Sequence, residues 1–335
     1  MPKSKIRSSS WFLAKAAISI AFLFFAMRKI DLASITEDVR SLNPFWLFLA
    51  LGQLLLVPIL GGARWRLVLR VLGEQIDLLS ATRLFWVGMM CSQVLPSTSG
   101  GDAIRIVLAW RTGIPFARST HSVILERLVM LSTLIALVTF IVLLGVKQTS
   151  IPGAGWLSPL LLCGAMGGMA FLIFADGIFA RLPSWKILRA LSELSSDARK
   201  LLFSPSSARV IGWSLLTHLN LAIAGLWLGK AIGLHLSLLD YVFYISLITL
   251  ITSLPLSIGG WGIREGAIVA LFGSAGVSAH SALAFSVLYG LSMAAISLGG
   301  LPFVSLKKAD QTVGGDGAVG QIQGGRKLPC FISMR

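Results

Sequence analysis

The chain has 335 residues, of which 55% are hydrophobic and 13% are charged, about half the charged fraction of a typical soluble domain. This composition excludes an ordinary soluble domain, which needs a charged surface. The net charge is +15, but the basic residues lie between apolar blocks rather than in one aromatic-interleaved patch, which argues against nucleic-acid binding. We find no P-loop, dinucleotide fingerprint or Ser-His-Asp arrangement, so we expect no catalytic residue. Cys91, Cys163 and Cys330 lack metal-ligand spacing, and we expect no metal or other cofactor.

The apolar residues form blocks of about 17–25 residues, the length of helix that crosses a ~30 Å hydrocarbon layer. Because lipid offers no hydrogen-bond partners, and the alternating strands of a barrel are absent, these blocks must be helices. The block at 11–27 follows a basic leader but lacks a small-x-small cleavage site, so we interpret it as a retained span. Full spans are predicted at 11–27, 44–62, 122–146, 156–175, 209–229 and 281–303.

Two further apolar stretches, 84–112 and 240–276, are interrupted by Pro and paired Gly. Each is predicted to be either a re-entrant hairpin or a broken helix that crosses the membrane. The predicted fold class is therefore an all-α polytopic membrane protein with about six full spans and two broken or re-entrant segments, arranged as an inverted repeat.

The orientation follows from the basic residues, which favour cytoplasmic loops. We place the N-terminus in the cytoplasm and let 84–112 enter and leave the membrane on the same side. The opposite side of the membrane then holds Arg28, Lys29, Arg40, Lys147 and Lys230. The cytoplasmic side then holds the larger set, which comprises Arg64, Arg66, Arg70, Arg83, Arg111, Arg118, Arg181, Lys186, Arg189, Arg199, Lys200, Lys307 and Lys308. We expect a multi-pass protein of the inner (cell) membrane with both termini in the cytoplasm.

The domain organisation is predicted to be a transmembrane domain over 1–305, with repeat halves at about 40–150 and 205–305. Between the halves, the cytoplasmic loop 176–208 carries Trp185, Leu188, Leu191 and Leu194 near helical spacing. It is predicted to be an amphipathic helix on the anionic inner leaflet. The tail at 306–335 is Gly-rich and polar, which is typical of disorder.

An internal repeat lies in the two interrupted segments. Residues 95–105 read LPSTSGGDAIR and residues 254–264 read LPLSIGGWGIR, so six of eleven positions match without a gap. Three full spans separate the copies, and an odd number places them in opposite orientations. Such an inverted repeat with discontinuous helices indicates a transport site near the bilayer midplane.

The chemistry of the repeat suits an anion. Pro96 and Pro255 end a helical hydrogen-bond ladder, and the following glycines allow a break from which a new helix begins. Its free N–H groups and positive dipole end favour an anion there. Arg105 and Arg264 lie about one turn into the new helix, where arginine can hold a phosphate bidentately. The break residues are Pro96, Gly100, Gly101, Pro255, Gly259 and Gly260.

Charges at membrane depth tend to be functional or paired, so we expect substrate contacts from Arg105, Arg264, Glu126, Arg127, Glu265 and Asp102. Two structural interpretations stay open. In the first, the Pro and Gly pattern serves close helix packing. In the second, the six charges only neutralise one another and hold the broken helices together. His218 and Asn220 suit interhelical hydrogen bonds or a pathway lining.

The runs SQVLPSTSGGDAIR, VILERL and SLPLSIGGWGIREGA resemble the membrane region of lysylphosphatidylglycerol synthases and their stand-alone flippase-like relatives. The resemblance covers about 11–305 and is most specific at 259–266. For the synthases it implies movement of a modified phospholipid to the outer leaflet, and for stand-alone relatives hopanoid, polysaccharide or glycolipid pathways. It assigns site roles to Arg105, Glu126, Arg127, Gly259, Gly260, Arg264 and Glu265.

The sequence departs from this family at two places. Nothing similar to an aminoacyl-transferase domain follows residue 305, so we expect no lipid lysylation by this chain. The run ERLVMLST carries Met130 and Ser132 where relatives often have an acidic residue, which leaves one charge fewer.

The expected function is a lipid transporter or flippase that moves a phospholipid, polyprenyl-linked glycolipid or hopanoid between leaflets. Arg105 and Arg264 are expected to hold its headgroup in turn, and Glu126, Glu265 or Asp102 to carry protons. Expected partners are membrane lipids, with an oligomer or an associated lipid-modifying or glycan-synthesis enzyme compatible with the sequence. The alternatives are a glycosyl- or lipid-transferase that uses a polyprenyl-phosphate donor, and a scaffold without transport.

Overall fold

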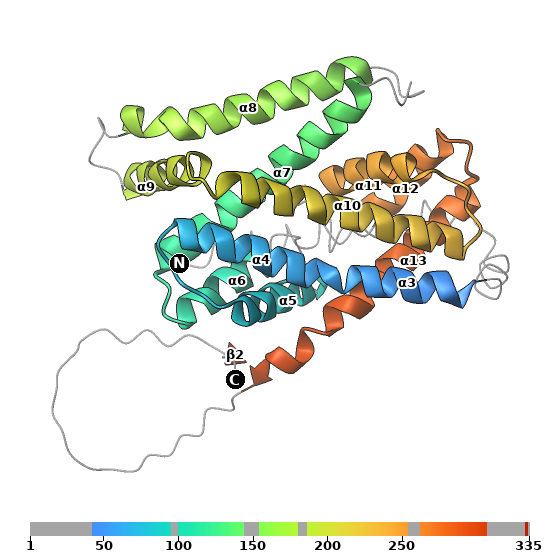
Figure 1. Ribbon diagram of the computed structural model, residues 1–335, viewed down its shortest axis with the longest axis horizontal. Coiled ribbons are helices and arrows are strands. Elements are labelled where there is room, and N and C mark those ends of the chain that lie inside the picture. Colours follow the sequence, from blue (N-terminus) through green and yellow to red (C-terminus); the bar gives the residue numbers. More distant parts are fainter. Residues whose placement is uncertain are drawn as a thin grey trace, which may run out of the picture.

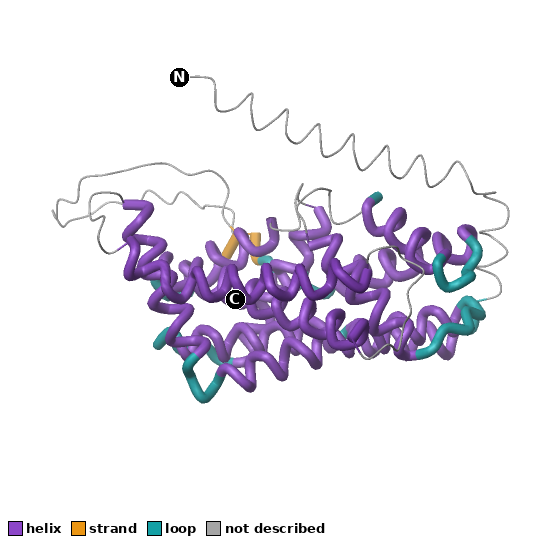
Figure 2. The backbone as a smooth tube through the Cα atoms, turned by 90° about the horizontal axis from the view of Figure 1, so that it is seen from above, coloured by secondary structure: helices purple, strands orange, loops and turns teal. Residues whose placement is uncertain are grey.

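The computed structural model describes residues 42–94, 100–143, 154–179, 186–253, 262–306 and 332–333, which are almost entirely helical (Figures 1 and 2). The all-α prediction is confirmed, with one small addition: Ser305–Leu306 (β1) pairs antiparallel with Ile332–Ser333 (β2). The elements before β1 are α3 (Pro44–Leu54), α4 (Leu56–Val71), α5 (Leu78–Val94), α6 (Gly100–Arg111), α7 (Phe116–Leu143), α8 (Ala154–Phe179), α9 (Lys186–Leu202), α10 (Ser207–Ala231), α11 (Leu238–Ser253), α12 (Ile263–Gly273), α13 (Ala279–Leu298) and the 3-10 turn Leu301–Phe303.

Among the described residues, four helices are long and apolar enough to cross a membrane: Pro44–Val71, Phe116–Leu143, Ser207–Ala231 and Ala279–Phe303. They coincide with four predicted spans. The span predicted at 156–175 lies within α8, whose apolar stretch Pro159–Phe171 is shorter. The span at 11–27, the tail beyond Leu306 apart from β2, and the break residues Pro96, Pro255, Gly259 and Gly260 lie outside the described residues.

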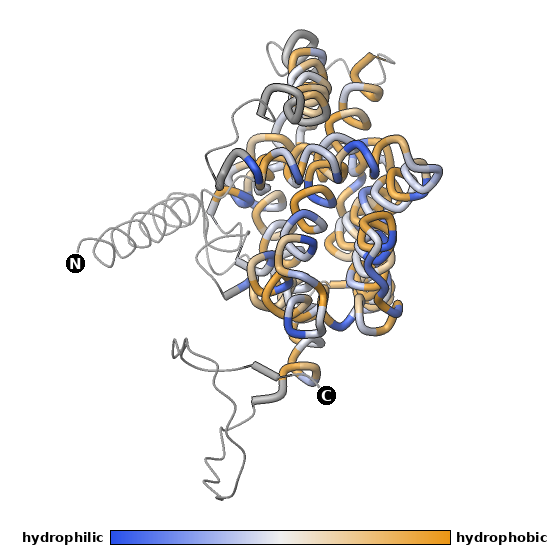
Figure 3. Tube along the Cα trace, turned by 90° about the vertical axis from the view of Figure 1, so that its left-hand side faces the viewer, coloured by the Kyte–Doolittle hydropathy of each residue, from blue (hydrophilic) through white to orange (hydrophobic). Residues whose placement is uncertain are grey.

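Hydrophobic residues predominate along many of these helices (Figure 3). Large apolar side chains on them remain exposed. Phe140 is 60% exposed, Leu143 70% and Phe174 69%. A surface of this kind suits contact with lipid rather than with water.

The order of helices in α4–α7 is repeated in α10–α13. In each set a long helix is followed by a glycine turn, two helices separated by an undescribed segment, a second glycine turn and another long helix. Four glycines adopt positive φ at these turns: Gly73, Gly113, Gly233 and Gly276. In all four turns the residue after the glycine donates its N–H to the carbonyl five residues earlier, as in Glu74 to Leu69 (2.9 Å) and Leu234 to Gly229 (2.8 Å). This is the Schellman ending, in which glycine avoids a Cβ clash.

The helices α5 and α6 form a hairpin that is held closed by glycine. A Cβ on Gly101 would lie 2.0 Å from the carbonyl oxygen of Gly88 and 2.1 Å from Oγ of Ser92. The backbones of α5 and α6 therefore touch at this point. In the second set aromatic rings join α11 to α12, with the centroids of Tyr244 and Phe272 5.7 Å apart. The two hairpins lie toward opposite ends of the long axis in Figure 1.

The predicted helix in the loop 176–208 is present as α9, but its apolar face contacts protein. Leu194, Ala198 and Leu201 are buried against residues of α4, α7 and α10. Asp197 on the same face accepts hydrogen bonds from Arg118, from His121 Nδ1 (2.8 Å) and from Lys200 Nζ (3.2 Å). The described apolar face of α9 therefore packs on the bundle. The sequence could not show this, because the same amphipathic spacing suits a lipid surface and a protein surface.

Candidate functional site

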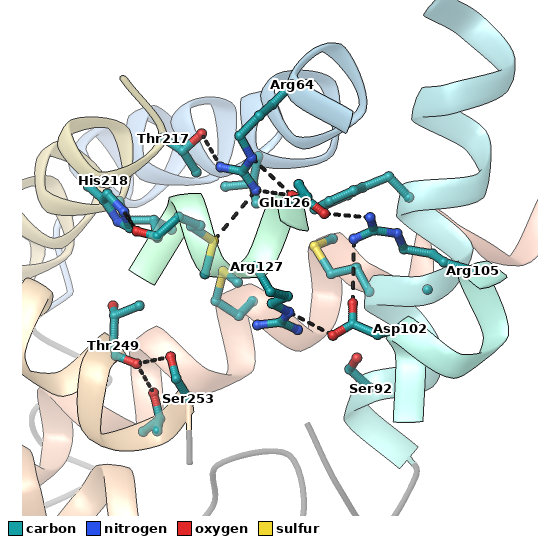
Figure 4. Close-up of a pocket in the computed structure, with 18 of the residues that line it drawn as sticks. Arg64, Ser92, Asp102, Arg105, Glu126, Arg127, Thr217, His218, Thr249 and Ser253 are labelled. Carbon is teal, nitrogen blue, oxygen red and sulfur yellow. Dashed lines mark hydrogen bonds and ion pairs between the residues drawn. The ribbon is translucent and has the colours of Figure 1, made fainter. Parts of the chain in front are cut away.

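A cavity of about 250 Å³ lies between the two helix sets. Helices α4, α5, α6 and α7 supply one part of its lining, and α10, α11 and α13 supply the other (Figure 4). Four of the predicted site residues meet here: Asp102, Arg105, Glu126 and Arg127.

Glu126 is at the centre of the charged wall. Arg64 donates to its Oε1 from both Nε (2.9 Å) and Nη2, and Arg105 donates to Oε2 from Nη2. These three side chains are at most 4% exposed. A buried carboxylate of this kind is tolerated because both oxygens are paired.

Aromatic rings of α4 and α5 pack against the guanidinium of Arg105. Its guanidinium carbon lies 4.6 Å from the ring centroids of both Trp65 and Phe85. A Cβ on Gly88 would lie 2.6 Å from Cγ of Arg105. The arginine is thus held between aromatic faces, a geometry that lysine could not reproduce.

Asp102 links Arg105 to Arg127. Arg127 Nε donates to Asp102 Oδ2 at 2.6 Å, and Arg105 Nη1 lies 3.4 Å from Oδ1. The Arg127 side chain is 34% exposed, against 4% for Arg105. Among the three arginines that line the cavity, Arg127 is therefore the most exposed.

Charge in this wall does not cancel. Three lining arginines, Arg64, Arg105 and Arg127, face two lining carboxylates, which leaves a net charge of +1. In a low-dielectric site an uncompensated charge is costly, so a monoanion is the complementary ligand.

The second copy of the repeat builds a different contact. Glu265 Oε2 accepts the N–H of Gly262, and its Oε1 accepts from Arg264 Nη2 (2.7 Å) and Ser286 Oγ (3.3 Å). Glu265 thus closes the start of α12 as a capping box closes a helix. Asp102, at the start of α6, bonds to Arg105 and Arg127.

Arg264 lines a second cavity of about 180 Å³ together with Tyr289. The guanidinium lies against α13, since a Cβ on Gly290 would come within 2.2 Å of Arg264 Nη2. The two cavities have five lining residues in common: Gln93, Leu221, Thr249, Thr252 and Met293. Uncharged side chains therefore separate Arg264 from the group around Arg127.

Sequence reasoning missed Arg64. The sequence alone places Arg64 among the basic residues between spans, but α4 continues to Val71 and buries Arg64 at 1% exposure. The sequence signal that indicates burial of Arg64 is its spacing of four residues from the apolar Val68, which puts both side chains on one helix face. Asn220, by contrast, makes the expected interhelical bonds to Gln53, at 2.8 Å and 3.2 Å.

Comparison with known proteins agrees with this architecture. The family model described as the lysylphosphatidylglycerol synthase TM region matches residues 12–300. The chain belongs to this family. The lysylphosphatidylglycerol synthase TM region thus accounts for every helix from α3 to α13. A UPF0104 membrane protein of Methanocaldococcus jannaschii is similar to part of the chain, with 30% identity over 129 residues. That stretch covers 38% of this chain and 38% of the archaeal protein.

Proposed function

We propose that the chain moves an amphipathic lipid with a phosphate-bearing headgroup between the leaflets of the inner membrane. The observation that carries the proposal is the positively charged cavity, in which Arg127 is partly exposed and the two carboxylates among the described lining residues are ion-paired. A phosphodiester carries the single negative charge that this cavity lacks, and arginine suits phosphate oxygens.

In the proposed arrangement, Asp102 binds Arg127 while no phosphate is bound there. Its carboxylate occupies the side of Arg127 that an incoming anion would take, at 2.6 Å from Nε. Asp102 remains in the wall when it releases Arg127, so the bound phosphate brings the net charge of the wall from +1 to zero, which favours binding at membrane depth.

The second cavity gives the headgroup a route. The five uncharged residues that line both cavities lie between the Arg127 group and Arg264, and the proposed route runs past them. In the proposed arrangement the hairpins α5–α6 and α11–α12 enter from opposite faces as inverted halves, so each arginine serves one leaflet. Basic Arg70 and Arg111 at the ends of α4 and α6 then face the cytoplasm, with both termini, and Lys230 at the end of α10 faces outward.

A transferase is the second candidate. Such an enzyme would need a carboxylate that is available as a base. Both carboxylates that line the first cavity, Asp102 and Glu126, are ion-paired with arginine. This pairing favours transport over group transfer at this site.

The test is leaflet exchange in liposomes that contain the purified chain and a fluorescent phosphodiester lipid. Wild type is expected to accelerate exchange, and Arg127→Gln to reduce it several-fold through the loss of the open cation. Arg209→Gln is the matched control, because Arg209 is exposed and bonds to Ser206 away from the cavity. No exchange of any lipid by wild type would favour the transferase or the scaffold.

A further inference from the structure

Trp86 of α5 is seated in a notch of α13. Its indole Nε1 donates to the carbonyl oxygen of Ile296 at 2.8 Å. A Cβ on Gly299 would lie 2.4 Å from Cζ2 of the indole, and a Cβ on Gly300 would lie 2.9 Å from the carbonyl oxygen of Trp86. The two glycines therefore leave the space that α5 and its tryptophan occupy, because small residues let helices approach closely.

The hydrogen bond of Trp86 is made where the helical ladder of α13 ends. The N–H of Gly299 donates to the carbonyl of Ile296 at 3.1 Å, and the N–H of Gly300 donates to that of Ser297 at 3.0 Å. Carbonyls in the last turn of a helix have no N–H four residues further on and depend on other donors. Trp86 supplies such a donor, so its departure removes one bond and leaves the helix itself intact.

Two further contacts lie beside the notch, in the 3-10 turn after α13. The ring centroids of Trp86 and Phe303 are 6.0 Å apart. The guanidinium carbon of Arg83 lies 5.4 Å from the centroid of the Phe303 ring. Aromatic and cation–π contacts of this kind hold two surfaces together with modest strength. We call the contacts of Arg83 and Trp86 with Ile296, Gly299, Gly300 and Phe303 the α5–α13 seam.

The seam continues the wall of the first cavity. Met89 and Gln93 line the cavity, and they follow Trp86 by three and seven residues on one face of α5. Met293 of α13 also lines the cavity, and Ile296 follows it by three residues. Met89, Met293 and Ile296 pack in one apolar cluster. The seam therefore lies directly beside the cavity, toward the start of α5 and the end of α13.

The other side of the seam suits lipid. Leu291, Leu298 and Leu301, which lie around the notch in the sequence, are 57%, 55% and 54% exposed. Apolar side chains with this exposure favour contact with hydrocarbon. The seam thus stands between a charged cavity and a lipid-facing surface. A lipid whose headgroup enters the cavity while its acyl chains stay in the hydrocarbon needs an opening between two helices at such a place.

We propose that the α5–α13 seam is a lateral gate, which opens the first cavity to the inner leaflet when Trp86 leaves its notch. The inference rests on the proposed function and adds the entry route to it. In the proposed orientation the start of α5 and the end of α13 face the cytoplasm, so this gate serves the inner leaflet. Because α5 belongs to one helix set and α13 to the other, a relative movement of the two sets opens the seam.

The test measures access to the cavity and does not depend on lipid movement. The native cysteines of the full chain are first replaced by Ser, namely Cys91, Cys163 and Cys330. Gln93→Cys then places a thiol in the cavity lining, and its labelling rate by membrane-permeant N-ethylmaleimide is measured in liposomes. Trp86→Ala is expected to raise this rate about five- to tenfold, the effect of one lost hydrogen bond with its packing. Trp110→Ala is the matched control and should leave the rate unchanged, because Trp110 is 50% exposed at the end of α6.

A second variant separates the hydrogen bond from the ring. Trp86→Phe keeps an aromatic side chain in the notch but cannot donate to Ile296, and about a two- to threefold higher rate is expected. It also provides the decision if Trp86→Ala does not fold. An unchanged labelling rate in Trp86→Phe would overturn the gate. A raised rate together with an absence of leaflet exchange by wild type in the same liposomes would confirm that the seam opens but overturn the proposed transport.

Discussion

Arg64 and Arg105, which are 41 positions apart in the chain, bind different oxygens of the same carboxylate, Glu126. The contact joins α4, α6 and α7 through side chains that are almost fully buried. It makes Glu126 the counter-ion of two arginines at once. Because both of its oxygens are ion-paired, we expect Glu126 to act as a structural counter-ion rather than as a proton carrier.

Replacement of Glu126 by Gln should destabilise the fold. The two guanidinium groups would face each other without a counter-ion, and the loss of one partner of a buried ion pair costs about 3–5 kcal/mol. We expect a lowered thermal unfolding temperature in detergent. The double variant Glu126→Gln with Arg64→Gln should recover part of the loss, since it removes one of the unpaired charges. No loss in the single variant would contradict the central role of Glu126.

Replacement of Asp102 by Asn should instead strengthen anion binding. Arg127 would lose its internal partner at 2.6 Å, and the net charge of the wall would rise by one unit. We expect several-fold tighter binding of a monoanionic phosphodiester lipid, measured by fluorescence titration. Weaker binding would show that Asp102 positions Arg127 rather than competes with the ligand.

The sequence allowed much of this structure to be predicted, for identifiable reasons. Span length and apolar composition are local properties, so α4, α7, α10 and α13 were predictable. The motif around Arg105 was visible because it occurs twice. Arg64 was not, because its partners Glu126 and Thr217 are 62 and 153 residues away. The hydrogen-bonding role of Thr249 could not be predicted either, because the fold decides whether its hydroxyl donates into the cavity or to the carbonyl of Ile245 in its own helix.

The docking of α9 should be insensitive to pH over the physiological range. Burial alone would raise the pKa of the Asp197 carboxyl, but hydrogen bonds from His121, Arg118 and Lys200 outweigh it and lower this pKa to about 2. A group with a lowered pKa stabilises the folded state above its ordinary pKa, 3.8, and loses that contribution as the pH falls toward 2.

We therefore expect hydrogen exchange in α9 to be constant from pH 8 to about pH 4, after correction for the intrinsic rate, and to rise below that. Asp197→Asn should raise exchange at every pH in this range. Protection that already falls between pH 8 and pH 6 would contradict the assignment of this docking to the Asp197 carboxylate.

Replacement of Gly101 by Ala should open the α5–α6 hairpin. The new Cβ would meet the carbonyl oxygen of Gly88 at 2.0 Å, and a backbone atom cannot move without the helix. We expect a loss of about 1–3 kcal/mol, as for other overpacked contacts, seen as a lower unfolding temperature. Gly52→Ala is the control, because nothing lies within 4 Å of a Cβ there. An equal effect of both changes would indicate a loss of helix flexibility rather than a clash.

Replacement of Gly290 by Ala tests the second arginine without breaking the fold. Here the Cβ would meet the guanidinium of Arg264, with Nη2 at 2.2 Å and Cζ at 2.6 Å. Unlike a backbone carbonyl, the end of an arginine side chain can move, so the helices stay packed while Arg264 leaves its position beside Glu265.

The first cavity does not include Arg264, and lipid binding there should persist. Leaflet exchange in liposomes should fall several-fold if the headgroup must pass to Arg264. Gly273→Ala, where a Cβ meets nothing within 4 Å, should leave exchange unchanged. Normal exchange in Gly290→Ala would show that the Arg127 group is sufficient and that the second cavity is not on the route.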